Sequence, residues 1–258
     1  IAFQKGDYKT AKEAAQQLLK VAGDNPMALQ LAGAIEFQSN SLVQAEAYLS
    51  KALQLAPGLG LAQRLLIMTH LRAGNADKAL SALQPMLAKA SVDPALFPIA
   101  GQVYLQTGDA KKAEEYFSKA AKLDPTDPKK RTAVAVASFK VGQVDAAVGE
   151  LQDIAASDAG VTADMALISA HLSRKEYDKA LKAIDALEKK QADKPLAANL
   201  RGRTLLAKQD VAAARKSFER ALTIDPAYFP AIASLAALDM IEKKPEDAKK
   251  RFEALVAK

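Results

Sequence analysis

The chain has 258 residues, of which half are apolar but only 5% are aromatic, and it contains no cysteine. Its 36 basic and 30 acidic residues give a net charge of +6. These values exclude disulfides and thiolate metal sites, and no uninterrupted stretch of apolar residues is long enough to span a membrane.

An alanine recurs at an almost constant interval along the chain. Successive members lie 34 residues apart, except for one interval of 33 residues between Ala147 and Ala180. A period in this range is typical of a stack of similar supersecondary units rather than of one globular core. We call these residues the repeat alanines: Ala11, Ala45, Ala79, Ala113, Ala147, Ala180, Ala214 and Ala248.

The positions around each repeat alanine predict two helices joined by a turn. Residues four and seven positions after it are mostly apolar and share its helical stripe, which defines a helix B. Gly or Asn stands five positions before it in most repeats and suits the left-handed residue that ends a helix A. A small residue, such as Gly101 or Gly202, often stands twelve positions before it. We expect this small residue to face the repeat alanine, so that the two helices approach closely.

In chain order, residues 1–25 contain the second half of a repeat, preceded by the end of a helix A at residues 1–5. Pro85 lies inside a helix B and is expected to kink or delay it, whereas Pro98 and Pro245 lie near helix starts. Because the array begins within a repeat, we expect the chain to be a fragment of a longer protein. Full repeats are predicted, in one continuous array, at 26–59, 60–93, 94–127, 128–160, 161–194, 195–228 and 229–258.

Two of these repeats carry most of a known consensus. Its members are Leu200, Gly202, Ala214, Phe218, Ala221 and Pro226 in one repeat, and Gly101, Tyr104, Ala113, Phe117, Ala120 and Pro125 in the other. The chain therefore resembles the tetratricopeptide repeat family, although it lacks the Trp of that family. The resemblance covers essentially the whole chain. It implies an all-α, right-handed superhelical solenoid of antiparallel helix pairs, with about seven and a half repeats.

Side chains with catalytic or metal-binding chemistry are few and scattered. His70 and His171 each lie nine positions before a repeat alanine, three repeats apart, so we expect them to wedge helix A against helix B. Glu36 and Asp239 occupy the same position and are expected to be half exposed or hydrogen-bonded. No zinc-protease, phosphate-loop, dinucleotide or nucleophile-elbow motif is present. The sequence predicts a protein that is not an enzyme and uses no cofactor or metal.

The A helices of such a solenoid form its inner, concave side, and we expect this side to be the functional surface. Positions 18, 15, 11 and 8 before the repeat alanines from Ala45 to Ala248 hold apolar and amide side chains, a few cations and no Asp or Glu. This pattern predicts a groove for a protein or peptide partner that is amphipathic or mildly acidic. No nucleic-acid partner is expected, because the basic residues form no continuous stripe. The residues expected to bind are Gln30, Phe37, Arg64, Met68, Gln102, Lys129, Phe139, Met165, Asn199, Arg203 and Met240.

Residues 218–231, with their Tyr-Phe-Pro link, and residues 244–253 resemble the bacterial tetratricopeptide lipoprotein of the PEP-CTERM exopolysaccharide system. The resemblance implies a scaffold in the periplasm or cell envelope of a Gram-negative bacterium that helps to assemble or export polysaccharide. Membrane attachment would then come only from a lipid anchor outside these residues. Two alternatives stay open. One is a cytoplasmic assembly or regulatory adaptor of the same fold, and the other is a glycan-binding module, for which Phe37 and Phe139 are the groove aromatics.

Overall fold

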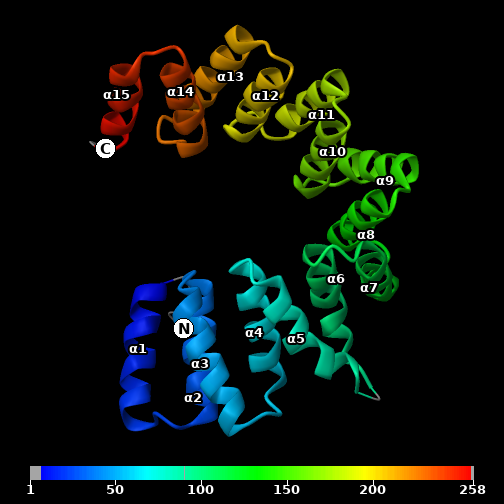
Figure 1. The fold of residues 1–258 in the computed structure, drawn as a ribbon, viewed down its shortest axis with the longest axis vertical. Coiled ribbons are helices and arrows are strands. Elements are labelled where there is room, and N and C mark those ends of the chain that lie inside the picture. The colour runs from blue at the N-terminus through cyan, green and yellow to red at the C-terminus, as the bar shows by residue number, and fades with distance from the viewer. Residues whose placement is uncertain (1–6, 90, 257–258) are drawn as a thin grey trace. The chain divides into compact units, whose positions relative to one another are not determined.

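The computed structural model describes residues 7–89 and 91–256, and the regular secondary structure within these ranges is entirely helical (Figure 1). It comprises fifteen α-helices and a short 3₁₀ helix, η2. This observation confirms the predicted all-α fold. The end of a helix A expected at residues 1–5 lies outside the described residues.

The chain divides into two compact units, Ile1–Gly142 and Gln143–Lys258. Unit 1 contains α1 (Tyr8–Val21), α2 (Pro26–Gln38), α3 (Leu42–Leu55), α4 (Gly60–Arg72), α5 (Ala76–Leu87), η2 (Pro94–Leu96), α6 (Phe97–Gln106), α7 (Ala110–Leu123) and α8 (Pro128–Val141). Unit 2 contains α9 (Val144–Ser157), α10 (Thr162–Ser173), α11 (Tyr177–Lys190), α12 (Leu196–Ala207), α13 (Val211–Ile224), α14 (Phe229–Ile241) and α15 (Pro245–Val256). The boundary falls between the two helices of the predicted repeat 128–160. That one continuous array runs across this boundary remains a prediction.

The even-numbered helices are the predicted A helices and the odd-numbered helices are the predicted B helices. Within each unit every helix packs against its neighbours in the chain. In unit 1, α2 also contacts α4, and α4 contacts α6, so these three A helices lie side by side (Figure 1). The consecutive A helices α2, α4 and α6 therefore form one shared surface in unit 1.

A left-handed residue ends every A helix from α2 to α14. Five positions before the repeat alanine, φ is positive at Asn40, Gly74, Gly108, Gly142, Lys175, Gln209 and Lys243, with values from 59° to 102°. The prediction of a left-handed turn is confirmed, even in the three repeats that have Lys or Gln there. Such side chains disfavour this conformation by roughly 1–2 kcal/mol, so the packing of the helix pairs imposes it.

Each helix pair packs around the repeat alanine and the large side chain four positions after it. Ala113, Phe117, Ala214 and Phe218 are all buried. A Cβ atom added at Gly202 would lie 2.5 Å from the ring of Phe218, and one at Gly101 would lie equally close to Phe117. The glycine therefore faces this large side chain, and the sequence-based expectation that it faces the repeat alanine was wrong. The reason is that the ring reaches across the helix pair and needs the space that a Cβ would fill.

Two of the three prolines discussed above lie where the sequence predicts, and the third, Pro85, has a different effect from the one expected. Pro98 is the second residue of α6 and Pro245 is the first of α15, as predicted. Pro85 does not delay α5, which runs unbroken from Ala76 to Leu87 around it. Its ring is therefore accommodated within the last turn of the helix, where few backbone hydrogen bonds are lost.

Candidate functional site

Two acidic residues nine positions before a repeat alanine, Glu36 and Asp239, pair with the preceding repeat. Lys12 Nζ lies 2.8 Å from Glu36 Oε2, and Arg215 Nη1 lies 2.7 Å from Asp239 Oδ1. In both pairs the cation directly follows a repeat alanine in the preceding helix B. Glu36 and Asp239 are buried, so the expected hydrogen bonding is confirmed. Their carboxylates hold neighbouring repeats together.

The two histidines are buried in the same position on their A helices. His70 Nδ1 has no hydrogen-bond partner among the described residues and lies 3.9 Å from Glu46 Oε2. Burial lowers the pKa of His70 more than Glu46 raises it. His171 Nδ1 lies 2.8 Å from Glu176 Oε2, and this contact, followed by that of Arg174, lowers the pKa of Glu176 to about 2. Both imidazoles are buried, as the predicted wedging role requires.

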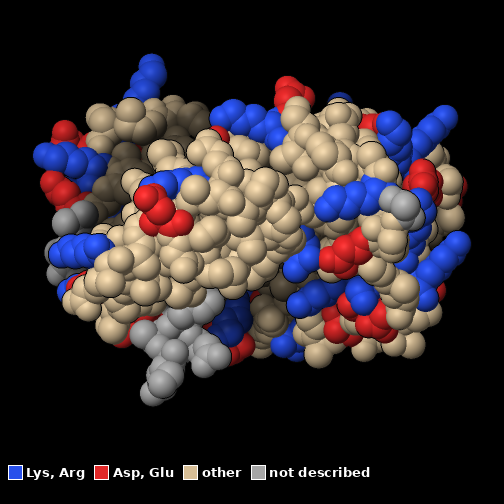
Figure 2. Space-filling view, turned by 90° about the horizontal axis from the view of Figure 1, so that it is seen from below, with Lys and Arg blue, Asp and Glu red and all other residues tan. Residues whose placement is uncertain are grey.

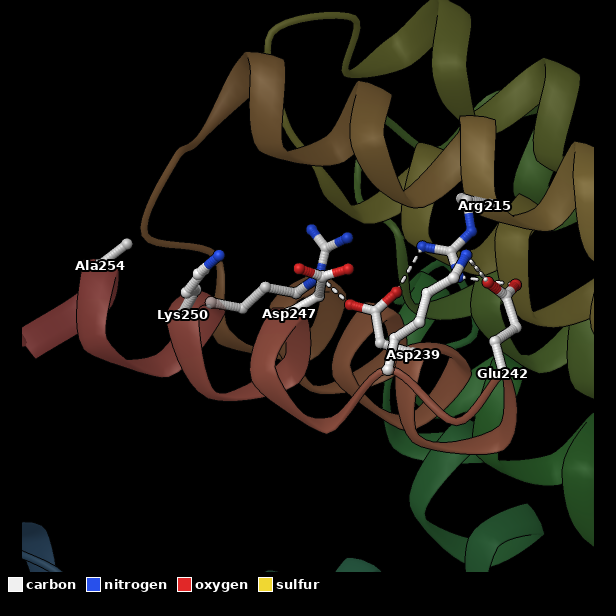
Figure 3. A pocket seen from close by; sticks show the side chains of 8 residues that line it. Arg215, Asp239, Glu242, Asp247, Lys250 and Ala254 are labelled. Carbon is white, nitrogen blue, oxygen red and sulfur yellow. Dashed lines mark hydrogen bonds and ion pairs between the residues drawn. The ribbon is translucent and has the colours of Figure 1, made fainter.

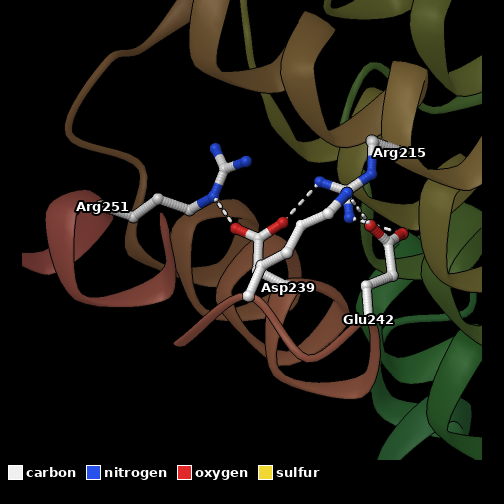
Figure 4. A network of polar contacts seen from close by, with 5 residues as sticks. Arg215, Asp239, Glu242 and Arg251 are labelled. Carbon is white, nitrogen blue, oxygen red and sulfur yellow. Dashed lines mark hydrogen bonds and ion pairs between the residues drawn. The ribbon is translucent and has the colours of Figure 1, made fainter. Parts of the chain in front are cut away.

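A charged pocket of about 480 Å³ opens between α13, α14 and α15 (Figure 3). Asp239 lies between two arginines: Arg215 Nη1 at 2.7 Å, and Arg251, whose Nε donates a hydrogen bond at 2.5 Å (Figure 4). Arg215 also binds Glu242, which in turn binds Lys244, each at 2.8 Å. Because these charges satisfy one another, the pocket is a structural ion-pair network. The residues that line it are Arg215, Asp239, Glu242, Lys244, Asp247, Lys250, Arg251 and Ala254.

We expect the substitution Asp239→Asn to lower the free energy of unfolding by about 1–2 kcal/mol at pH 7, because it removes a charge that two arginines share. Burial raises the pKa of Asp239, but the hydrogen bonds from Arg251 and Arg215 outweigh burial and hold that pKa below its ordinary value of 3.8. The stabilisation is therefore complete above pH 3.8 and is lost as the pH falls through the lowered pKa. Urea unfolding of both proteins between pH 7 and pH 2 measures this difference. A difference that persists undiminished at pH 2 would contradict the assignment.

A groove of about 410 Å³ lies across three consecutive A helices of unit 1, and we call it the unit 1 groove. Its floor and walls are mostly apolar, and the glutamines of α6 present their amides to solvent at one side. None of the described residues that line it is Asp or Glu. The residues that line it are Phe37 of α2, Met68, Leu71 and Arg72 of α4, and Pro98, Ile99, Gln102 and Gln106 of α6.

Arg72 is the single charged residue of the unit 1 groove and is held from two directions. Its guanidinium carbon lies 3.9 Å from the centroid of the Phe37 ring, and its Nη1 donates a hydrogen bond of 2.9 Å to the Phe37 carbonyl. Arg72 remains exposed to solvent. A stacked, tethered guanidinium loses little conformational freedom when it binds an anion. The groove therefore offers an apolar surface beside one prepositioned positive charge.

The structure separates the eleven predicted binding residues into several groups. Phe37, Met68 and Gln102 come together in the unit 1 groove. Arg203 lies in a second groove, in unit 2. The side chains of Lys129, Met165 and Met240 are exposed outside both grooves, and Phe139 is half-buried.

The remaining predicted residues are engaged within the protein. Gln30 is buried and its Oε1 accepts a hydrogen bond from the Ala62 amide. Asn199 is buried, and its Oδ1 has no partner within the described part of the chain. Arg64 forms a 2.6 Å ion pair with Asp93. Gln30 and Asn199 therefore offer almost no surface to a partner, and Arg64 is already neutralised.

Arg72, Ile99 and Gln106 line the unit 1 groove but were not among the predicted residues. Arg72 and Gln106 lie seven positions before a repeat alanine, and Ile99 lies fourteen positions before one. These positions are three or four residues from the predicted ones and share their helical stripe. A wider stripe would have included them.

The face of the molecule in Figure 2 carries no large patch of one charge among its described residues. Lys and Arg alternate there with Asp and Glu, with uncharged surface between them. Among the described residues, no cluster of three or more His, Cys, Asp or Glu side chains could hold a metal ion. No helix in the described ranges is both long and apolar enough to cross a membrane.

The family model described as "Tetratricopeptide repeat" matches residues 1–59, 64–128, 135–195 and 165–229. No curated protein gives a significant match. Yeast Tom70 is similar in structure, with a TM-score of 0.69 and 17% identity over 95% of this chain and 54% of its own. The APC/C hetero-tetramer Cut9-Hcn1 gives a TM-score of 0.64 and 18% identity, over 89% of this chain and 46% of the matched chain. A tetratricopeptide repeat protein from Parabacteroides merdae gives a TM-score of 0.61 and 16% identity, over 90% of this chain and 92% of its own.

The chain spans about half the length of the chains matched in Tom70 and in Cut9-Hcn1. At these identities the similarities establish the fold.

Proposed function

Because the chain belongs to the tetratricopeptide repeat family, we propose that it is a non-catalytic scaffold for protein–protein interactions, with a peptide of its partner bound in the unit 1 groove. Proteins of this family bind protein or peptide partners and are generally not enzymes. The observation that carries the proposal is Arg72, a tethered cation on an otherwise apolar groove that contains no acid.

The chemistry of the unit 1 groove specifies the class of peptide. Met68, Pro98 and Ile99 provide an apolar surface for one or two aliphatic side chains of the peptide. Arg72 complements a carboxylate next to them, and its planar fork can bind both carboxylate oxygens. The exposed amide of Gln102 can hydrogen-bond to the peptide backbone. The preferred ligand is therefore a short segment with neighbouring aliphatic and acidic residues.

We expect Arg72→Glu to weaken binding of such a peptide at least tenfold, because a lost charge-assisted hydrogen bond is worth about 1.5–3 kcal/mol. The probe is a fluorescent octapeptide of alternating Leu-Leu and Glu-Glu pairs with both termini capped. Fluorescence anisotropy measures its affinity, and melting curves check that the variant is folded.

Arg220→Glu is the matched control for charge, because Arg220 lies on α13 and lines neither groove. If Arg72→Glu bound the peptide with the same affinity and in the same amount per chain as the wild type, the assignment of the unit 1 groove would be refuted. A peptide with Lys in place of Glu should not bind.

We further propose that the scaffold acts in a bacterial envelope exopolysaccharide system, supported by the sequence resemblance of residues 218–231 and 244–253. Fractionation of cells that express the full-length gene product tests the location. Recovery in the cytoplasmic fraction would favour the adaptor alternative. The glycan-binding alternative finds little support, because Phe37 is buried and Phe139 half-buried, which leaves little ring surface for a sugar.

A further inference from the structure

The arginines of this chain differ in whether an acid of the protein neutralises them. Arg72 and Arg203 line grooves and have no carboxylate partner among the described residues. Each of the following has a carboxylate within ion-pair distance: Arg64, Arg174, Arg201, Arg215, Arg220 and Arg251. Each unit thus has one groove-lining arginine whose charge is available to a ligand.

Arg203 stands at the edge of a groove of about 420 Å³ between α12, the start of α13 and α14, which we call the unit 2 groove. Its lining is mostly apolar, as in unit 1. Glu242 is the one acid in it, and this carboxylate is already bound by Arg215 and Lys244 at 2.8 Å each. The lining residues are Arg203, Leu206, Val211, Ser234, Ala237, Leu238, Ile241 and Glu242.

Ile241 and Val211 leave apolar surface open to solvent in the unit 2 groove, which Arg203 also lines. The side chain of Ile241 is 77% exposed, and Val211 across the groove is 44% exposed. The corresponding position of the other repeats, seven before the repeat alanine, holds Gln38, Arg72, Gln106, Lys140, Ser173 and Ala207. Ile241 therefore adds exposed aliphatic surface to the groove at a position where the other repeats have polar or small residues.

We propose that the unit 2 groove is a second receptor for a segment with neighbouring aliphatic and acidic residues, so that one chain binds two such segments. The inference rests on the proposed function of the unit 1 groove and extends its ligand class. Ile241, Val211 and Leu206 would receive the aliphatic side chains, and Arg203 would bind the carboxylate. A partner with two such motifs would gain affinity, because its second motif binds intramolecularly.

Isothermal titration of the intact chain with the capped Leu/Glu octapeptide tests this proposal. The wild type should bind two peptides per chain. Arg203→Glu and Ile241→Ser should each bind one, with at least a tenfold loss of affinity at the second site and no change at the first. Arg72→Glu combined with Arg203→Glu should bind none. Arg220→Glu changes the net charge equally and should still bind two.

The possible outcomes separate the two proposals. One peptide per chain, dependent on Arg72 and unaffected by Arg203→Glu, would overturn the second site and leave the proposed function standing. No peptide bound by the folded wild type would overturn both. The proposed ligand class would be overturned if the capped peptide did not bind to the unit 2 groove while a 12-nucleotide single strand of nucleic acid bound there in an Arg203-dependent way.

Discussion

Phe218→Ala is expected to lower the free energy of unfolding by about 3–5 kcal/mol, the usual cost of removing a buried aromatic side chain. Phe218 is fully buried between α12, α13 and α14, in the largest hydrophobic cluster of unit 2. Gly202 leaves no side chain that could fill the cavity. Urea unfolding followed by far-UV circular dichroism measures the effect.

The matched control for Phe218→Ala is Phe252→Ala. Phe252 occupies the same position of the last described repeat, four residues after Ala248, but it is 40% exposed. Because it removes less apolar area from water, its loss should cost clearly less. Equal effects of the two substitutions would show that burial against a following repeat does not stabilise this position.

Gly202→Ile is expected to lower the free energy of unfolding by about 3 kcal/mol or more, at the upper end of overpacking effects. Even a Cβ at Gly202 would lie 2.5 Å from the Phe218 ring, which is enclosed and cannot swing away. A larger branched side chain must push the two helices apart.

A second substitution should rescue Gly202→Ile. The equivalent pair one repeat earlier, Ile168 with Ile184, is fully buried in the same unit. Gly202→Ile combined with Phe218→Ile recreates that pair and should recover most of the lost stability. Additive losses in this double-mutant cycle would contradict the contact between the two positions.

The period of the alanines was sufficient to predict the helix pairs, their turns and their order. It works because each unit repeats one local solution: a left-handed turn, a small residue on helix A and a large one on helix B. The prediction that the glycine of helix A faces the repeat alanine was wrong. Residue spacing gives the face of a helix on which a residue lies, but not how far a ring such as that of Phe218 reaches. The division into two units at Gly142 has no counterpart in the repeat pattern.

The candidate site was predicted only in part. Positions on helix A located Met68, Gln102 and Arg203 in grooves. Spacing alone could not show that Asn199 is buried, nor that Asp93 neutralises Arg64, because both depend on how the chain packs in three dimensions. The same limit applies to Arg72, whose role depends on the ring and carbonyl of Phe37 in another repeat.

Photo-cross-linking tests most directly whether a partner peptide lies across the A helices of unit 1. The capped octapeptide would carry photoleucine at its aliphatic positions, and mass spectrometry would identify the residues that it labels. We predict labels on Met68, Pro98 and Ile99 that disappear in Arg72→Glu. Labels confined to B helices such as α3 and α5, or unchanged in that variant, would contradict the account.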